Sequence, residues 1–84
     1  MNVNQMRGVT SELKSCVWLL EQGYHVIKNV ANYGPIDVIA YKPETKEIVL
    51  FDVKSLGHSG HPDETQKALG VKILQVFGDQ FRVN

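Results

Sequence analysis

The stretch from Gly34 to Ser55 reads GPIDVIAYKPETKEIVLFDVKS, and it decides how the rest of the chain can fold. Two runs rich in β-branched and aromatic residues flank a polar segment that contains a proline, which is typical of a β-hairpin with a longer loop. If Pro43 to Lys46 forms the loop, Tyr41 faces Ile48 across the hairpin. The stretch therefore predicts two antiparallel strands in a defined register.

The same register gathers three ionisable side chains on one face of the hairpin. Asp37 faces Asp52, and Lys54 lies on the same face as Asp52 because side chains alternate along a strand. Directly opposed Cβ atoms lie roughly 4.5–5.5 Å apart, where like charges destabilise a sheet. A shared proton or a bound divalent cation would offset this repulsion. The alternative interpretation is a salt-bridged, solvated sheet face with no further role.

The length and composition indicate one small domain over residues 1–84. A chain of this size forms a modest core, which self-association would enlarge. Nine basic and nine acidic residues give no net charge, which argues against strong non-specific binding to duplex DNA. A nucleic-acid enzyme remains compatible with this balance, because a bound cation would cancel several of the acids.

The chain carries no recognisable export signal or membrane span. The segment Met1 to Gln5 is polar, and no stretch approaches the ~20 apolar residues that a membrane helix needs. Cys16 is the single cysteine, so no internal disulfide can form, and we expect a buried, inert thiol. These features predict an intracellular, cytoplasmic protein without a membrane partner.

Residues from about Asn4 to Gln22 predict a helix, with Gly23 following as its capping glycine. Glu12 falls about 40° from Cys16, at the border of the apolar stripe, and can approach the two aspartates if the helix packs on the sheet. An ordinary flanking acid is the alternative role for Glu12. The apolar stripe, which we expect to face the core, comprises Met6, Val9, Leu13, Cys16, Val17 and Leu20.

Trp18, Lys14 and Arg7 line up on the opposite side of this helix, where we expect them to point away from the core. Aromatic and arginine side chains are enriched at interfaces, so this face predicts a partner surface. A tryptophan covered by a chain terminus is the alternative.

Further elements surround the hairpin. Tyr24 to Val30 predicts a first strand, and Ala31 to Gly34 a turn into the hairpin. The breaker-rich segment from Ser55 to Asp63 predicts a mobile loop. Its imidazoles, His58 and His61, lack accompanying cysteines, which disfavours structural zinc; contact with a substrate or no role at all is the expectation.

Asp63 and Gln66 have the spacing of a reciprocal helix cap, which predicts a short helix through Leu69 that ends at Gly70. The remaining elements are a strand over Val71–Phe77, a turn at Gly78-Asp79 and a strand over Gln80–Val83. The order is helix, three strands, helix, two strands. We therefore expect an α/β (α+β) fold with a central mixed sheet of four to five strands flanked by helices.

This order of elements and acids resembles the PD-(D/E)XK nuclease superfamily, and is most similar to the small archaeal Holliday junction resolvases, RecB-like nucleases and related phage enzymes. The resemblance spans about Gly8 to Phe77. Two departures are that Pro35 lies two residues before Asp37 and that Asp52 is the shorter of the two acids the motif allows. The residues that carry the match are Glu12, Pro35-Ile36-Asp37, Asp52-Val53-Lys54 and Gln66.

The resemblance implies a restriction-endonuclease-like core and a set of site residues. Asp37 and Asp52 would bind Mg²⁺ or Mn²⁺ together with the Val53 carbonyl, and Glu12 would be an additional or water-mediated ligand. Lys54 would orient or help to deprotonate the attacking water. Gln66 would position substrate or water.

Elementary chemistry agrees with this assignment. Hydrolysis of a phosphodiester needs a cation that neutralises the phosphate, a water of lowered pKa and a positioned proton acceptor. Two carboxylates plus waters suit Mg²⁺, whether the site holds one ion or two.

We therefore expect a metal-dependent deoxyribonuclease, with an endonuclease or an exonuclease mode left open, of the kind used in DNA recombination and repair or encoded by phage. A small core favours recognition of DNA structure over base sequence. A homodimer is expected, with the Trp18 face as the candidate interface. The alternatives are a non-catalytic nucleic-acid or protein-binding module with the same fold, and a bare scaffold. Residues expected to contact substrate are Ser55, His58, His61, Lys14 and Arg7.

Overall fold

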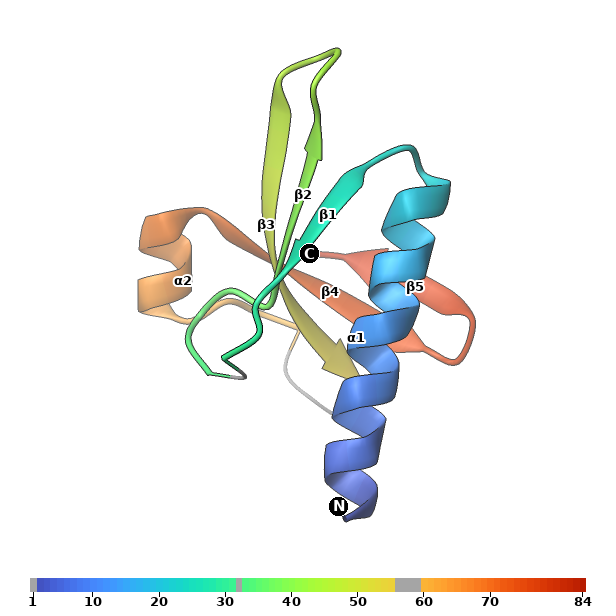
Figure 1. Cartoon of the computed structure of the whole chain (residues 1–84). Helices are drawn as coiled ribbons and strands as arrows, with labels where there is room; N and C mark the ends of the chain where they lie inside the picture. Colours follow the sequence, from blue (N-terminus) through green and yellow to red (C-terminus); the bar gives the residue numbers. More distant parts are fainter. Residues whose placement is uncertain (1, 32, 56–59) are drawn as a thin grey trace.

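The computed structural model describes residues 2–31, 33–55 and 60–84. Its elements follow the expected order, with the first strand shorter than predicted (Figure 1). They are α1 (Val3–Glu21), β1 (His25–Lys28), β2 (Val38–Lys42), β3 (Glu47–Ser55), α2 (Glu64–Leu69), β4 (Val71–Phe77) and β5 (Gln80–Val83).

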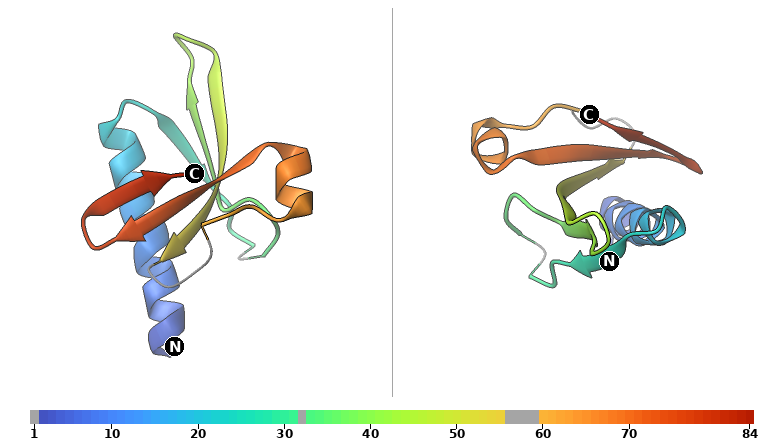
Figure 2. Two further views of the ribbon diagram at one scale, coloured as in Figure 1. Left: turned by 180° about the vertical axis from the view of Figure 1, so that it is seen from behind. Right: turned by 90° about the horizontal axis from the view of Figure 1, so that it is seen from above.

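The strands form one mixed sheet in the order β1-β2-β3-β4-β5. Strands β3 and β4 are parallel, and the other three pairs are antiparallel. A parallel pair needs a crossover connection, and α2 lies within the one that joins β3 to β4. The two helices lie on opposite sides of the molecule (Figures 1 and 2). The predicted mixed sheet flanked by helices is confirmed.

The central hairpin has the predicted register. Tyr41 pairs with Ile48, and residues 43–46 form the connecting turn. Lys46 has a φ of 62°, a left-handed conformation that side chains other than glycine adopt mainly in turns. The loop length and the alternation of apolar residues therefore fixed the pairing, as the sequence predicts.

Helix α1 packs on the sheet through the side that carries two serines and a leucine. Its buried residues are Ser11, Ser15 and Leu19. The Ser15 hydroxyl donates a hydrogen bond of 2.8 Å to the Ser11 carbonyl, so the serine is buried with its donor satisfied by the helix itself. Leu19 forms one core with residues of the strands, namely Val38, Ala40, Phe51, Val53, Leu74 and Val76.

The expected core-facing stripe of α1 faces solvent instead, so that prediction is wrong. Cys16 is an exception, since it is half-buried and packs against the core. The opposite side of the helix, which carries Ser11, Ser15 and Leu19, is the one that meets the sheet. The side chains left between 43% and 57% exposed are Met6, Val9, Leu13, Val17 and Leu20.

Trp18 is correspondingly turned inward, which corrects the prediction of an outward tryptophan. Its ring stacks on Phe81 of β5, with centroids 4.9 Å apart and planes inclined by 8°. On the same side of the helix, the Lys14 ammonium donates to the Gly78 carbonyl over 3.2 Å. These contacts attach α1 to the β4–β5 hairpin, whereas Arg7 is exposed.

The short helix α2 has both predicted caps. The Asp63 side chain accepts from the Gln66 amide and the Gln66 side chain accepts from the Asp63 amide, which together form a capping box. Gly70 ends the helix with a φ of 76°, which costs little for glycine. Among the described residues, neither this helix nor α1 is both long and apolar enough to cross a membrane.

Replacing Trp18 with alanine tests the inward packing of this side chain. Loss of the stacked, half-buried indole should lower the free energy of unfolding by about 2 kcal/mol. Chemical denaturation at low protein concentration measures the change. As a matched control, Tyr33→Ala removes an aromatic ring that is 80% exposed, and should cost less than about 0.5 kcal/mol. Equal effects of the two substitutions would contradict the packing described.

Candidate functional site

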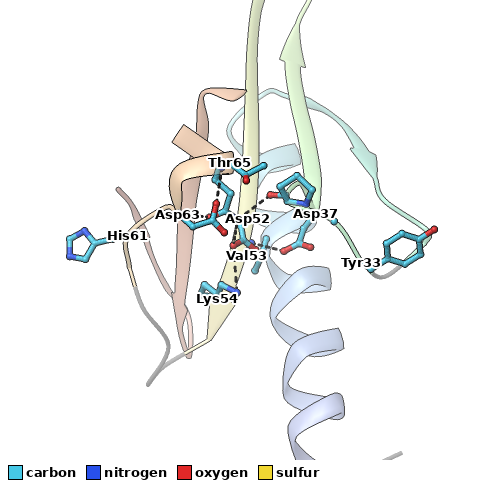
Figure 3. A pocket seen from close by; sticks show the side chains of 11 residues that line it. Tyr33, Asp37, Asp52, Val53, Lys54, His61, Asp63 and Thr65 are labelled. Carbon is cyan, nitrogen blue, oxygen red and sulfur yellow. Dashed lines mark hydrogen bonds and ion pairs between the residues drawn. The ribbon is translucent and has the colours of Figure 1, made fainter. Parts of the chain in front are cut away.

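A pocket of about 700 Å³ opens at the point where the sheet, the turn before β2 and the start of α2 meet (Figure 3). Polar and charged side chains from these three segments converge on it. The lining residues are Tyr33, Gly34, Pro35, Asp37, Asp52, Val53, Lys54, His61, Asp63, Thr65 and Gln66.

Asp37 lies where β2 and β3 diverge, just before the first residue of β2. The two strands pair as far as Val38 opposite Phe51, and the Asp37 amide still donates to the Phe51 carbonyl over 2.8 Å. Two residues further along β3, the Val53 amide donates instead to Oδ2 of the Asp37 side chain, again over 2.8 Å. A side-chain oxygen thus takes the place of a backbone acceptor, and the Asp37 carboxylate is held beside Asp52 as the register predicts (Figure 3).

Asp52 is buried, with 7% of its surface exposed, and two side chains hold it. Its Oδ2 atom accepts from Gln66 Nε2 over 2.7 Å and lies 3.5 Å from Lys54 Nζ. The same Gln66 nitrogen donates to the Pro35 carbonyl over 3.2 Å. Since a buried carboxylate needs such partners, Gln66 is part of what allows an acid at this position.

The acidic pair has an altered proton affinity. The pKa of Asp37 is raised from 3.8 to about 6, chiefly because burial disfavours the charged form. A hydrogen bond with the Asp52 side chain and the negative charges of Asp52 and Glu12 raise this pKa further, while the Val53 amide opposes the rise. Below about pH 6, a proton on Asp37 therefore relieves the repulsion within the pair, which is one of the two arrangements that the register predicts.

The pair also has the donor chemistry of a site for a hard cation. The contacts from Val53, Gln66 and Lys54 are all made to Oδ2 atoms, so none of these three groups of the described residues occupies the Oδ1 atom of either carboxylate. Mg²⁺ retains several waters and commonly binds proteins through one or two carboxylates, which this pocket has room for. Within residues 2–31, 33–55 and 60–84, no group of three or more His, Cys, Asp or Glu side chains is placed to hold a metal.

Glu12, the third acid expected at this site, lies elsewhere. Its Oε1 atom is 3.6 Å from Lys28 Nζ, and Glu12 is not among the residues that line the pocket. Its charge nevertheless contributes to the raised pKa of Asp37. The role of Glu12 as a metal ligand therefore stays a prediction.

The residues expected to contact substrate are divided between two hollows. His61 lines the acidic pocket, whereas Ser55, Arg7 and Lys14 line a neighbouring hollow of about 500 Å³ beside α1. His58 lies outside the described residues.

Sequence reasoning missed several residues of the pocket. The sequence identifies Asp63 only as a helix cap, although its hydrogen-bonded partner Gln66 reaches the acidic pair. Thr65 and Tyr33 also line the pocket. The spacing of Asp63, Thr65 and Gln66 at the start of one helix could have placed the first two near the site, but nothing in the sequence points to Tyr33.

Comparisons with known proteins identify the fold. The structure matches that of a bacterial homing endonuclease, I-Ssp6803I, with a TM-score of 0.76, over 99% of this chain and 69% of that protein. Sequence identity between the two is 11%. No described protein family matches the sequence, and no curated protein matches it. The expected restriction-endonuclease-like fold is thus confirmed.

The raised pKa of Asp37 gives a stability prediction. Between pH 3.8 and about 6, the folded state keeps a proton that the unfolded chain releases, so stability falls as the pH rises through this window. Asp37→Asn removes the titrating group and can still accept from the Val53 amide. In EDTA at pH 7.5 it should raise the free energy of unfolding by about 1 kcal/mol, a figure reduced for solvent screening at a half-buried site.

Denaturant titrations of the native chain and Asp37→Asn at pH 4 and pH 7.5 measure this difference, which should nearly vanish at the lower pH. Asp79→Asn is the matched control, because Asp79 lies exposed in the β4–β5 turn. Its effect should stay within about 0.5 kcal/mol at both pH values. A loss of stability on Asp37→Asn at pH 7.5 would contradict the pKa assignment.

Proposed function

We propose that the chain is a metal-dependent nuclease that hydrolyses phosphodiester bonds in DNA. The observation that carries the proposal is the meeting of Asp37, Asp52 and Lys54 in one open pocket, with Gln66 holding Asp52. The shared fold with a homing endonuclease supports it.

In this proposal Asp37, Asp52 and the Val53 carbonyl hold Mg²⁺ or Mn²⁺, as the oxygen-rich pair favours. A bound divalent cation would neutralise phosphate charge and lower the pKa of a bound water.

The remaining roles belong to the chain's own side chains. The Val53 amide and Gln66 fix the orientations of the two carboxylates, because each makes a short hydrogen bond to one of them. Lys54 is partly exposed at the pocket and lies 3.5 Å from Asp52, so its ammonium is available to a phosphate oxygen or to the attacking water. Preorganised charges that stabilise the transition state are usually the largest single contribution to catalysis of this kind.

DNA structure, not base sequence, is the proposed basis of recognition. Lys54 and Ser55 line a further hollow of about 440 Å³ together with α1, and Ser55 also borders the hollow that contains Arg7 and Lys14. A strand that leaves the acidic pocket past Lys54 would therefore meet hydroxyl and basic groups suited to phosphates. Such contacts fit branched, single-stranded or end substrates of recombination and repair.

One observation favours the non-catalytic alternative, a binding module that retains the fold. Glu12 is paired with Lys28 and does not line the pocket. Metal binding without cleavage of any DNA would support this alternative.

The decisive experiment compares cleavage by the native chain, Asp37→Asn and Lys54→Ala in Mg²⁺ and in Mn²⁺. Each substitution should lower the cleavage rate at least ~100-fold, because it removes a metal ligand or the charge at the reacting phosphate. Lys72→Ala, which removes an exposed lysine of β4 outside the pocket, should leave the rate unchanged. Circular dichroism verifies that every variant is folded.

Calorimetric titration with Mn²⁺ separates loss of metal from loss of chemistry. Asp37→Asn should abolish binding, whereas Lys54→Ala should retain it. Full cleavage in EDTA, or equal activity of Lys54→Ala and the native chain, would refute the proposal. A panel of single strands, duplexes, flaps, forks, four-way junctions and RNA then identifies the substrate.

A further inference from the structure

The outer side of α1 carries a continuous apolar stripe. Its members are spaced three or four residues apart, and all are between 43% and 64% exposed. From the first member to the last is 17 residues, about 25 Å of helix. The α1 stripe comprises Val3, Met6, Val9, Leu13, Val17 and Leu20.

Two hollows widen this apolar surface along one flank of the helix. Leu13 and Val17 form a wall of a hollow of about 490 Å³ that Trp18 and Phe81 also line. Val3 and Met6 border the hollow of about 500 Å³ that reaches Val76. Contiguous exposed apolar surfaces are a common feature of protein interaction sites. Side chains from a partner could fill the hollows as well as cover the stripe.

We propose that a second copy of this chain covers the α1 stripe from Val9 to Leu20, with the two α1 helices packed antiparallel about a twofold axis near residue 14. We choose a second copy as the partner because the charged residues beside the stripe are complementary to themselves in an antiparallel pair. Arg7, Lys14 and Glu21 follow one another at intervals of seven residues beside the stripe. Antiparallel pairing centred on residue 14 places Arg7 of each copy beside Glu21 of the other, which gives two ion pairs.

Other features of the flanks agree with this pairing. Lys14 falls at the centre, where it would meet its own copy, but its ammonium is held back by the Gly78 carbonyl. A parallel pair would bring the flank with Arg7 and Lys14 against the opposite flank, where Glu12 is already paired with Lys28. Of the two arrangements, only the antiparallel one allows Arg7 of one copy to form an ion pair with Glu21 of the other.

The stripe and the acidic pocket are separate surfaces. The pocket is lined by the turn before β2, β3 and the segment that starts α2, and none of its lining residues belongs to α1. A dimer through the stripe therefore leaves the acidic pocket open, although it covers part of the hollow with Arg7 and Lys14 that borders the proposed DNA path. Sedimentation and metal-dependent cleavage are measured separately, so either result can fail without the other.

Sedimentation equilibrium of the full chain, over concentrations from about 1 µM to 1 mM, tests the proposal. We expect a monomer–dimer equilibrium. Leu13→Glu places two like charges near the twofold axis and removes apolar contact, so the dissociation constant should rise at least ~10-fold. Ile48→Glu is the matched control, since Ile48 is 69% exposed on β3 away from the stripe, and it should leave the constant unchanged.

Charge reversal tests the direction of the helices. Arg7→Glu and Glu21→Arg should each weaken the dimer several-fold, and the double variant should restore it. Circular dichroism establishes that the variants are folded. A native chain that stays monomeric at about 1 mM, or a dimer insensitive to Leu13→Glu, would overturn the proposal. Failure of the double variant to recover would overturn the antiparallel pairing.

Discussion

The hydrogen bond from the Val53 amide to the Asp37 carboxylate is the contact on which the site depends. It forms where β2 leaves β3, so the hairpin has to end there for an acid to replace a backbone acceptor. The register then leaves Asp52 beside Asp37, and the repulsion between them has to be relieved by a proton or a cation. The requirement that each buried amide find a hydrogen-bond acceptor thus places two acids side by side and raises the pKa of Asp37.

The crossover between the parallel strands completes the arrangement. Because β3 and β4 run in the same direction, the chain has to return along the sheet, and α2 lies on that return path. Its Gln66 reaches both Asp52 and the Pro35 carbonyl, so one amide connects three segments that are distant in the sequence. The topology therefore brings a neutral donor to a buried carboxylate without adding another charge.

Local patterns predicted the sheet well because alternation and turn chemistry act over a few residues. The hairpin loop, the cap at Asp63 and the strand over Val71–Phe77 are as expected. The side of α1 that meets the sheet was predicted wrongly, because both sides of that helix are compatible with burial. Ser15 can be buried because its hydroxyl donates a hydrogen bond to the Ser11 carbonyl within the helix. A hydropathy pattern does not take such a bond into account. The partner of Glu12 was beyond sequence reasoning for a related reason: it depends on how the helix is rotated against β1.

The margins of the sheet limit the ways in which copies of this protein can join. Strands β1 and β5 are the two edge strands of the sheet, and each is four residues long. A short border exposes few backbone donors and acceptors, so it is a poor template for adding strands from another molecule. Growth into cross-β fibrils is thereby discouraged at both borders, even though the hairpin of β2 and β3 is rich in residues that favour such assemblies.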